Sequence, residues 1–424
     1  MTVIGRVPIE TLYLGLYDGP HATPKPAAEG PIFLGIGNLT EDGKLDLSDI
    51  RHIAEEDFAA WTKRVTPQPG DIVFTYEASL NRYARIPDGF RGCLGRRLAL
   101  IRPDSQKVNP LFLFYYFFGE DWRRTISKNT LSGATVDRIP LTTFPTFEID
   151  LPCRSAQDAI ASILSAYDDL IENNTRRIKI LEEMAKMIYQ EWFVDFRFPG
   201  HKKVAVVNSG GLVGPEGWER TVVERACVSV DDGDWIETKD QGGDSYRLLQ
   251  VSNIGLNAFV ETDNYRFVSE ETFQKLRCRE VVPGDILVAR MPTPIGRAWL
   301  VTPQAWRMIT AVDVAILKAK KSTSLFLLQF LNSAETLAAC SAQASGTTRE
   351  RITRKQIASL PVLLPPAELR VHFEGLVKPI NELMDKLRNL NRKLSQTRNL
   401  LLPKLISGEI NVEHFEAEPV AQGV

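Results

Sequence analysis

The sequence predicts an α+β protein: two similar α+β domains separated by a pair of long antiparallel coiled-coil helices. Three observations support this fold class. The chain of 424 residues repeats itself once, each copy is rich in short β-type runs, and a long helical pattern follows each copy. A chain of this length is expected to form two or three domains of ordinary size. The repeat predicts that the two halves are related by a pseudo-twofold axis.

Four landmarks occur twice, in the same order and about 213 residues apart. SGATVDRI begins at Ser132 and SGTTRERI at Ser345, while PGDIVF begins at Pro69 and PGDILV at Pro283. The other two pairs are IFLGIGNL with RLLQVSNI, and FEIDLP with PVLLPP. A nearly constant offset of this kind indicates a duplicated structural unit.

Short apolar runs between Pro and Gly turns predict the strands of each copy. They are IFLGIG, DIVFTY, RRLALIR and TFEIDL in the first copy, and RLLQVS, DILVAR and AVDVAILKA in the second. A helical patch is expected over residues 47–61. The pattern predicts domains at 1–152 and 199–366, long helices at 153–198 and 367–410, and an acidic tail at 411–424. Turn residues over 194–217 predict a linker.

Both long helical segments carry apolar residues at alternating steps of four and three, the period of a coiled-coil seam. In the first segment the seam is Ile160, Leu164, Tyr167, Ile171, Ile178, Leu181, Ala185, Ile188 and Trp192, with Asn174 in the missing position. In the second it is Phe373, Leu376, Ile380, Leu383, Leu387, Leu390, Leu394 and Leu401, with Thr397 in the missing position. A dimerising coiled coil is the alternative. Packing within one chain is favoured because the linking domains keep the effective concentration high.

Composition and motifs exclude several classes of function. The five cysteines and five histidines are scattered, which argues against disulfides and metal sites. No signal peptide and no apolar run of membrane-spanning length is seen, so a cytoplasmic protein is expected. The sequence has no P-loop, HExxH, GxSxG or kinase set, and no Pro-Pro-aromatic methyltransferase loop. FLGIGN resembles a loop that holds S-adenosylmethionine, but the second copy, LLQVSN, lacks both glycines. A tight turn is therefore expected there and no cofactor.

The net charge is only −2, yet basic residues are concentrated. Residues 82–128 hold ten basic and four acidic side chains, and residues 266–307 hold seven and four. Two loops that follow the repeated PGDI strand lie in these regions. Loops on a rigid scaffold and arginine side chains suit contacts to phosphates and base edges. The candidate DNA-binding residues are Arg82, Arg85, Arg91, Arg96, Arg97, Arg290, Thr293, Arg297, Arg349 and Arg351. Surface ion pairing is the alternative for each arginine.

The SGATVDRI and SGTTRERI segments also have two interpretations. Ser and Thr can cap a short helix and Gly permits a tight turn, which favours a structural role. Arg349, Arg351, Arg354 and Lys355 make phosphate contact by the second copy the alternative.

Two variable β-rich domains, each followed by a long helix, resemble the plan of type I restriction–modification specificity subunits. LEEMAKMIYQEWFVDFRFPG at 181–200 resembles the central conserved region of that family, and TRNLLLPKLISGEI at 397–410 resembles its distal conserved region. GNLTEDGKLDLSDI at 37–50 and SGATVDRIP at 132–140 resemble recurring pieces of its target-recognition domains.

The resemblance implies a non-catalytic subunit that binds a bipartite DNA target, one half-site per domain. It also implies that the helices recruit two modification subunits, which methylate adenine, and that restriction subunits add a nuclease and translocase. S-adenosylmethionine, ATP and Mg would then be bound only by those partners. The helix residues expected to contact subunits and to set the domain separation are Ile160, Tyr167, Asn174, Leu181, Trp192, Ile380, Leu387 and Leu394. A self-contained DNA-modifying enzyme and a coiled-coil scaffold are the alternatives.

Overall fold

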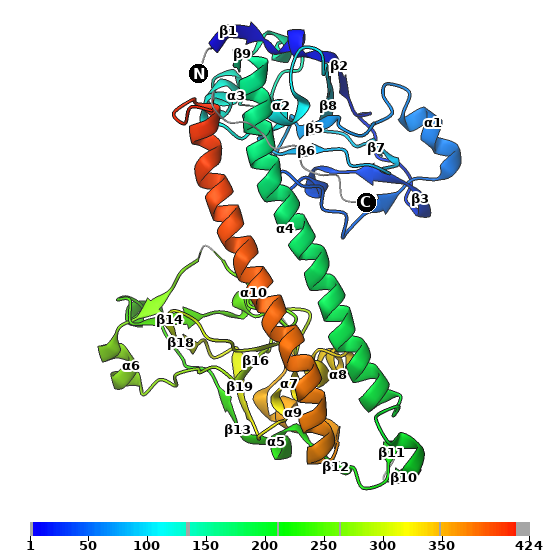
Figure 1. Ribbon diagram of the computed structural model, residues 1–424, viewed down its shortest axis with the longest axis vertical. Helices are drawn as coiled ribbons and strands as arrows, with labels where there is room; N and C mark the ends of the chain where they lie inside the picture. Colours follow the sequence, from blue (N-terminus) through cyan, green and yellow to red (C-terminus); the bar gives the residue numbers. More distant parts are fainter. Residues whose placement is uncertain (1–2, 133–135, 210–211, 263, 347–348, 413–424) are drawn as a thin grey trace. The chain divides into compact units, whose positions relative to one another are not determined.

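The computed structural model describes residues 3–132, 136–209, 212–262, 264–346 and 349–412. It divides into two compact units, Met1–Asn173 with Asn391–Val424, and Asn174–Leu390. Each unit contains one globular part and about half of each of two long helices (Figure 1).

The globular part of unit 1 contains three small sheets. Their strand orders are β1-β9, β2-β8-β5-β6 and β4-β3-β7, with β3 and β7 parallel and the other pairs antiparallel. Two helices, α2 and α3, follow the strand β8. The bounds are β1 Val3–Pro8, β2 Tyr13–Asp18, β3 Ala27–Leu34, β4 Arg51–His52, α1 Phe58–Trp61, β5 Ile72–Thr75, β6 Tyr83–Arg85, β7 Gly92–Leu94, β8 Leu98–Pro103, α2 Pro110–Tyr116, α3 Glu120–Asn129 and β9 Glu148–Pro152.

The globular part of unit 2 repeats this arrangement. Its sheets have the orders β12-β20, β13-β19-β16-β17 and β15-β14-β18, with β14 and β18 parallel, and it adds the hairpin β10-β11. The bounds are β10 Val206–Ser209, β11 Leu212–Pro215, β12 Glu219–Val222, α5 Val223–Ala226, β13 Cys227–Asp232, β14 Tyr246–Leu249, β15 Phe267–Val268, α6 Glu270–Leu276, β16 Ile286–Ala289, β17 Ala298–Leu300, β18 Arg307–Thr310, β19 Val314–Ala319, α7 Ser324–Leu331, α8 Ala334–Gln343, α9 Arg354–Ala358 and β20 Pro361–Leu364.

The repeated motifs make the same local contacts in both units. In each PGDI segment the aspartate accepts a hydrogen bond from the backbone three residues earlier: Asp71 from Gln68 at 2.8 Å and Asp285 from Val282 at 3.0 Å. Each motif thereby closes its own turn and leads into a fully buried strand, β5 or β16. The predicted duplication and all seven predicted strands are confirmed.

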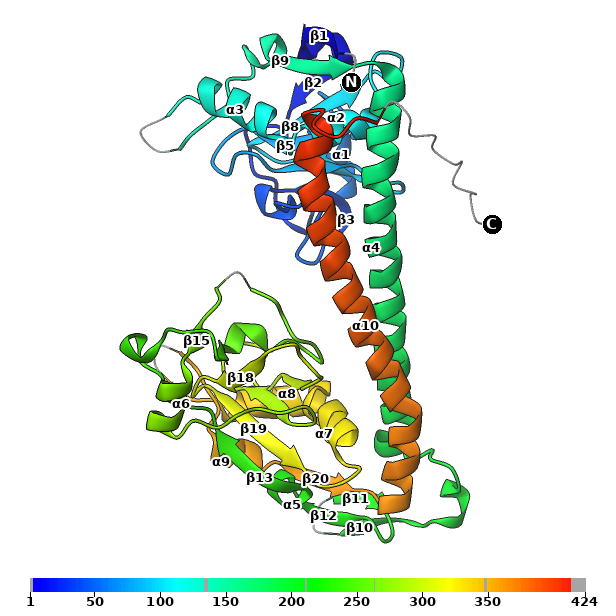
Figure 2. The same cartoon turned by 60° about the vertical axis from the view of Figure 1, so that its left-hand side comes forward.

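The two long helices are α4, Arg154–Tyr189, which continues as a π-helix to Val194, and α10, Ala367–Ile406. They lie side by side in each unit (Figures 1 and 2). In unit 1, Ile160 of α4 shares a core cluster with Leu402 and Leu405 of α10. In unit 2, the rings of Trp192 and Phe373 lie 6.1 Å apart. The beginning of one helix therefore packs on the end of the other, which confirms the antiparallel pair.

The predicted seam is confirmed on α4 and partly wrong on α10. Every predicted α4 position is buried or half-buried, including Asn174. On α10, Ile380, Leu387 and Leu394 are also buried or half-buried, but other predicted positions lie in solvent: Leu376, Leu383, Leu390 and Thr397. The buried row of α10 lies one position C-terminal to them: Val377, Met384, Asn391 and Arg398 are buried or half-buried.

Three further expectations concern the helical patch at 47–61, the helix cap near the second Ser-Gly segment, and segments that lie outside the described residues. The patch at 47–61 contains strand β4 and only a short 3-10 turn followed by α1, because the apolar side chains there are irregularly spaced. The helix that follows the second Ser-Gly segment is capped by Thr353, the residue just after that segment, whose hydroxyl accepts from Gln356 N at 3.2 Å. Residues 133–135, 347–348 and most of the acidic tail lie outside the described residues. Within the described part, no helix is long and apolar enough to span a membrane.

Candidate nucleic-acid interface

In each unit the loop that follows the PGDI strand lies beside the Ser-Gly segment. In unit 1, Ile139 N donates to Tyr76 O at 2.7 Å and Ala78 N donates to Asp137 O at 3.0 Å. In unit 2, Ile352 N donates to Arg290 O at 3.1 Å, where Arg290 occupies the place of Tyr76 in the repeat. Both segments were candidates from the sequence, but their pairing is a tertiary contact. It defines one two-loop surface in each unit.

Three candidate arginines of unit 1 are ion-paired. Arg82 donates to Glu41 at 3.3 Å, and Arg97 lies 3.8 Å from Glu77. Arg91 is bidentate to Glu55, with Nη1 at 2.7 Å, and its guanidinium lies 4.5 Å from the ring centroid of Phe58. The carboxylates Glu41 and Glu55 are themselves largely exposed. Pairs with such exposed carboxylates contribute little free energy, so Arg82 and Arg91 can exchange a carboxylate for a phosphate at small cost.

The other two candidate arginines of unit 1, Arg85 and Arg96, form no ion pair among the described residues. Arg85, at the end of β6, is half-buried, and its Nε has no hydrogen-bond partner within the described part of the chain. Arg96 is exposed, and no ion pair to it occurs among the described residues. Its neighbour Arg97 has a left-handed backbone, φ 73°, and its carbonyl accepts from Tyr76 N at 3.1 Å. The turn at Arg96 therefore lies beside the two-loop surface.

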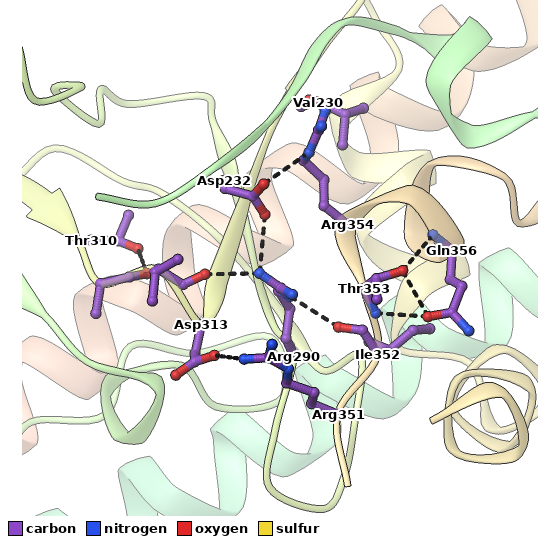
Figure 3. A network of polar contacts seen from close by, with 12 residues as sticks. Val230, Asp232, Arg290, Thr310, Asp313, Arg351, Ile352, Thr353, Arg354 and Gln356 are labelled. Carbon is purple, nitrogen blue, oxygen red and sulfur yellow. Dashed lines mark hydrogen bonds and ion pairs between the residues drawn. The ribbon is translucent and has the colours of Figure 1, made fainter. Parts of the chain in front are cut away.

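Arg290 of unit 2 has a structural role instead of the predicted contact with DNA. It is 7% exposed. Figure 3 shows its guanidinium donating to Ile352 O at 2.9 Å and to Asp232 at 3.0 Å, and it also donates to Val312 O at 2.9 Å. Asp232 also accepts from Arg354 at 3.0 Å. This network joins the two loops to β13, and its donors are occupied inside the domain.

Arg297 is likewise occupied. It is 8% exposed and donates to four backbone carbonyls, those of Val251, Ile254, Pro292 and Pro294, at 2.5–3.1 Å. Burial lowers the pKa of this guanidinium from its ordinary value. The side chain thus holds the loop at 290–297 in place by hydrogen bonds to its backbone and to that of residues 251–254. For Arg290 or Arg297 to contact a base, the side chain would first have to break its hydrogen bonds to backbone carbonyls of its own domain.

The remaining candidates of unit 2 lie at the surface. Thr293 and Arg349 are exposed, and neither has a side-chain hydrogen bond within the described residues. Arg351 is exposed and lies 3.4 Å from Asp313 (Figure 3). All three belong to the two loops of the unit 2 surface and are accessible to solvent.

A basic face on α3 was missed as a candidate site, although its residues were counted in the charge distribution. Trp122 and Ile126 of α3 are buried, so the opposite face presents Arg123, Arg124 and Lys128 to solvent. A search for helical periodicity over residues 120–129 would have found this face. The corresponding helix of unit 2, α8, contains no Lys or Arg.

The glycine pair of FLGIGN forms a turn that both units share. Gly35 N donates to the side chain of Asn38 at 2.8 Å, and Gln250 N donates to that of Asn253 at 2.9 Å. Each asparagine closes an identical 3-10 turn, with or without glycine. The expectation of a shared turn is therefore confirmed. No cluster of three metal-ligating side chains occurs among the residues that the structure describes.

The chain matches proteins of one family over nearly its whole length. The family profile described as "Type I restriction modification DNA specificity domain" matches residues 32–183. The chain is 24% identical over 373 residues to the type I restriction enzyme MjaIX specificity subunit of Methanocaldococcus jannaschii, which covers 86% of this chain and 83% of that protein. It is 19% identical over 443 residues to the HindI specificity subunit of Haemophilus influenzae, with 89% and 94% covered.

A solved structure shows the same fold. The S subunit of a type I restriction–modification system from M. genitalium superposes with a TM-score of 0.57 and 14% identity, covering 94% of this chain and 95% of that one. The duplicated α+β units, the antiparallel helices and the sequence matches define a DNA target-recognition protein. Within that class, the chain is similar over most of its length to specificity subunits of type I restriction–modification enzymes, and the profile of that family matches residues 32–183.

Proposed function

We propose that the chain binds a bipartite DNA target, one half-site per unit, and leaves the bases between them unread. The observation that carries this proposal is the duplication: both units present the same pair of loops on the same sheet topology. Two copies of a DNA-binding surface on one chain suit a target of two half-sites at a defined spacing, as in dimeric DNA-binding proteins.

The proposed contact residues are side chains that are exposed, weakly paired or, for Arg85, half-buried with an Nε that is unpaired among the described residues. In unit 1 they are Arg82, Arg85, Arg91, Arg96 and Arg97, and in unit 2 they are Thr293, Arg349 and Arg351. Arginine can bind guanine O6 and N7 in a bidentate manner, and arginine side chains and the threonine hydroxyl can both bind phosphate. Asp313 and Glu77 keep Arg351 and Arg97 oriented before DNA arrives.

We further propose that the long helices recruit modification subunits, which supply methylation, and that restriction subunits join the same assembly. The exposed leucines of α10 support this proposal. Leu376, Leu383 and Leu390 are 43%, 38% and 46% exposed and recur every seven residues, the spacing of a second coiled-coil stripe. On the unit 2 half of α4, Ile180 and Met187 are also exposed. Apolar stripes of this kind on a soluble helix are typical of an unfilled protein interface.

The test combines DNA binding with methylation mapping. The chain is expressed together with a type I modification subunit, and the methylated positions of the host genome are determined. A bipartite motif with a constant gap is expected. Methylation of a continuous motif, or binding that is independent of sequence in gel shifts with and without the modification subunit, would contradict the proposal and favour a scaffold.

A further inference from the structure

A buried polar network in unit 1 joins the globular part to both long helices. Arg398 on α10 is 7% exposed, and its Nη1 donates to Oδ1 of Asp168 on α4. The hydroxyl of Tyr115 on α2 donates to Oδ2 of the same aspartate at 2.6 Å. The other donors of Arg398, Nε and Nη2, bind Asn399 at 3.2 and 3.0 Å. The Asp168 carboxylate on α4 thus accepts hydrogen bonds both from α10 and from the globular part of unit 1.

Unit 2 contains a similar network, in which different residues connect the two helices to the globular part. Arg388 on α10 donates through Nη2 to Glu182 on α4 at 2.6 Å. Its Nη1 donates to the backbone carbonyl of Asn257 at 3.0 Å and to Asp385 at 3.2 Å. Asn257 belongs to the loop between β14 and β15 and has a left-handed backbone, φ 52°. Again one arginine of α10 connects its own helix, α4 and the globular part.

These networks differ in kind from the apolar contacts around them. Apolar contacts are nondirectional and tolerate small sliding of one element over another. Hydrogen bonds between a guanidinium and a carboxylate are strongly directional. Partly buried ion pairs add little net stability, because desolvation offsets their attraction, but the directional hydrogen bonds of each network favour one arrangement of its partners. We therefore expect the networks to affect the orientation of the elements that they join more than the free energy of unfolding.

We propose that the Arg398–Asp168–Tyr115 network and the Arg388–Glu182 network to the Asn257 carbonyl act as positioning clamps. Each fixes the angle at which its recognition domain leaves the helix pair, and together they fix the spacing between the half-sites that the assembly accepts. The inference rests on the proposed bipartite recognition. None of these residues needs to touch DNA, so the bases read within each half-site do not depend on them.

The experiment measures gap selectivity in the assembled complex. Wild type and variants, each with the modification subunits, methylate a DNA library in which the wild-type half-sites are separated by gaps from two base pairs shorter to two longer. The test variants are Tyr115→Phe, which removes one hydroxyl, and Glu182→Gln, which removes one charge; Arg398→Lys supplements them. The controls are Lys386→Gln and Lys393→Gln, two exposed positions on α10. Thermal melting verifies folding of every variant.

The expected result is a loss of gap selectivity without a change of motif. Methylation at gaps one base pair shorter or longer, relative to the wild-type gap, rises by up to about tenfold in the test variants, the effect of losing one hydrogen bond, and stays constant in the controls. An unchanged gap preference in folded Tyr115→Phe and Glu182→Gln overturns the clamps, and so does altered base preference within a half-site. A wild-type complex with no fixed gap overturns the proposed function itself.

Discussion

Helix length gives the most quantitative prediction for this chain, because both long helices pass through both units. Four residues inserted at Asn174 of α4 and four at Leu390 of α10 lengthen the pair at one level. In unit 1 the neighbouring residue Asn391 donates to the carbonyl of Ile171 at 3.2 Å, which places these two levels opposite each other. The insertions fall between Arg388 and Arg398 on α10, so both polar networks remain within their own units.

The geometry of the two helices fixes the expected size of the effect. Four residues add about 6 Å and rotate the helix by about 40° beyond a full turn. DNA advances about 3.4 Å and turns by about 35° for each base pair. One additional base pair matches the added rotation, and two match the added length. The recognised gap is therefore expected to lengthen by one or two base pairs while both half-site sequences stay the same.

Methylation mapping of the insertion variant measures this gap. A variant with four residues added after Val412 controls for chain length, since it leaves α4 and α10 unchanged. An active insertion variant that keeps the original gap would refute the reasoning and show that something other than helix length separates the half-sites. Changed half-site bases would refute it as well, because no base-reading loop has been altered.

Three further outcomes are expected. Leu383→Glu with Leu390→Glu abolishes co-purification of the modification subunit and leaves the melting temperature unchanged, since exposed substitutions alter stability by about 0.5 kcal/mol at most; retained binding would exclude this stripe as the interface. Arg96→Ala and Arg349→Ala each weaken binding to all DNA sequences and reduce the slope of log K against log salt by about one, whereas loss at a single base would identify base readers. Arg297→Ala lowers the free energy of unfolding by about 1–3 kcal/mol in chemical denaturation, because it removes a buried side chain that makes four hydrogen bonds to backbone carbonyls; unaltered stability with impaired DNA binding would restore its predicted contact with DNA.

The domain plan could be predicted because it depends on patterns that recur locally along the chain. The landmarks PGDI and Ser-Gly-x-Thr occur twice at one offset, and the same contacts close both copies. The strands were predictable because short β-type apolar runs between turn residues specify a strand locally. Helix α2 was not predicted, because Pro110–Tyr116 is apolar on all sides and periodicity cannot distinguish a buried helix from a buried strand.

The sequence by itself determined the duplication, the strands, the helix pair and the resemblance to type I specificity subunits. Only the tertiary structure decided which neighbour each side chain meets. The apolar residues of α10 form two different stripes with a seven-residue spacing, and either could face the other helix. Only the position of α4 determined that Met384 is buried while Leu383 is exposed. An arginine in a polar loop looks the same whether it binds DNA or its own backbone. Arg297 binds four carbonyls because loops distant in sequence converge on it, and such long-range contacts leave no periodic trace in a single sequence.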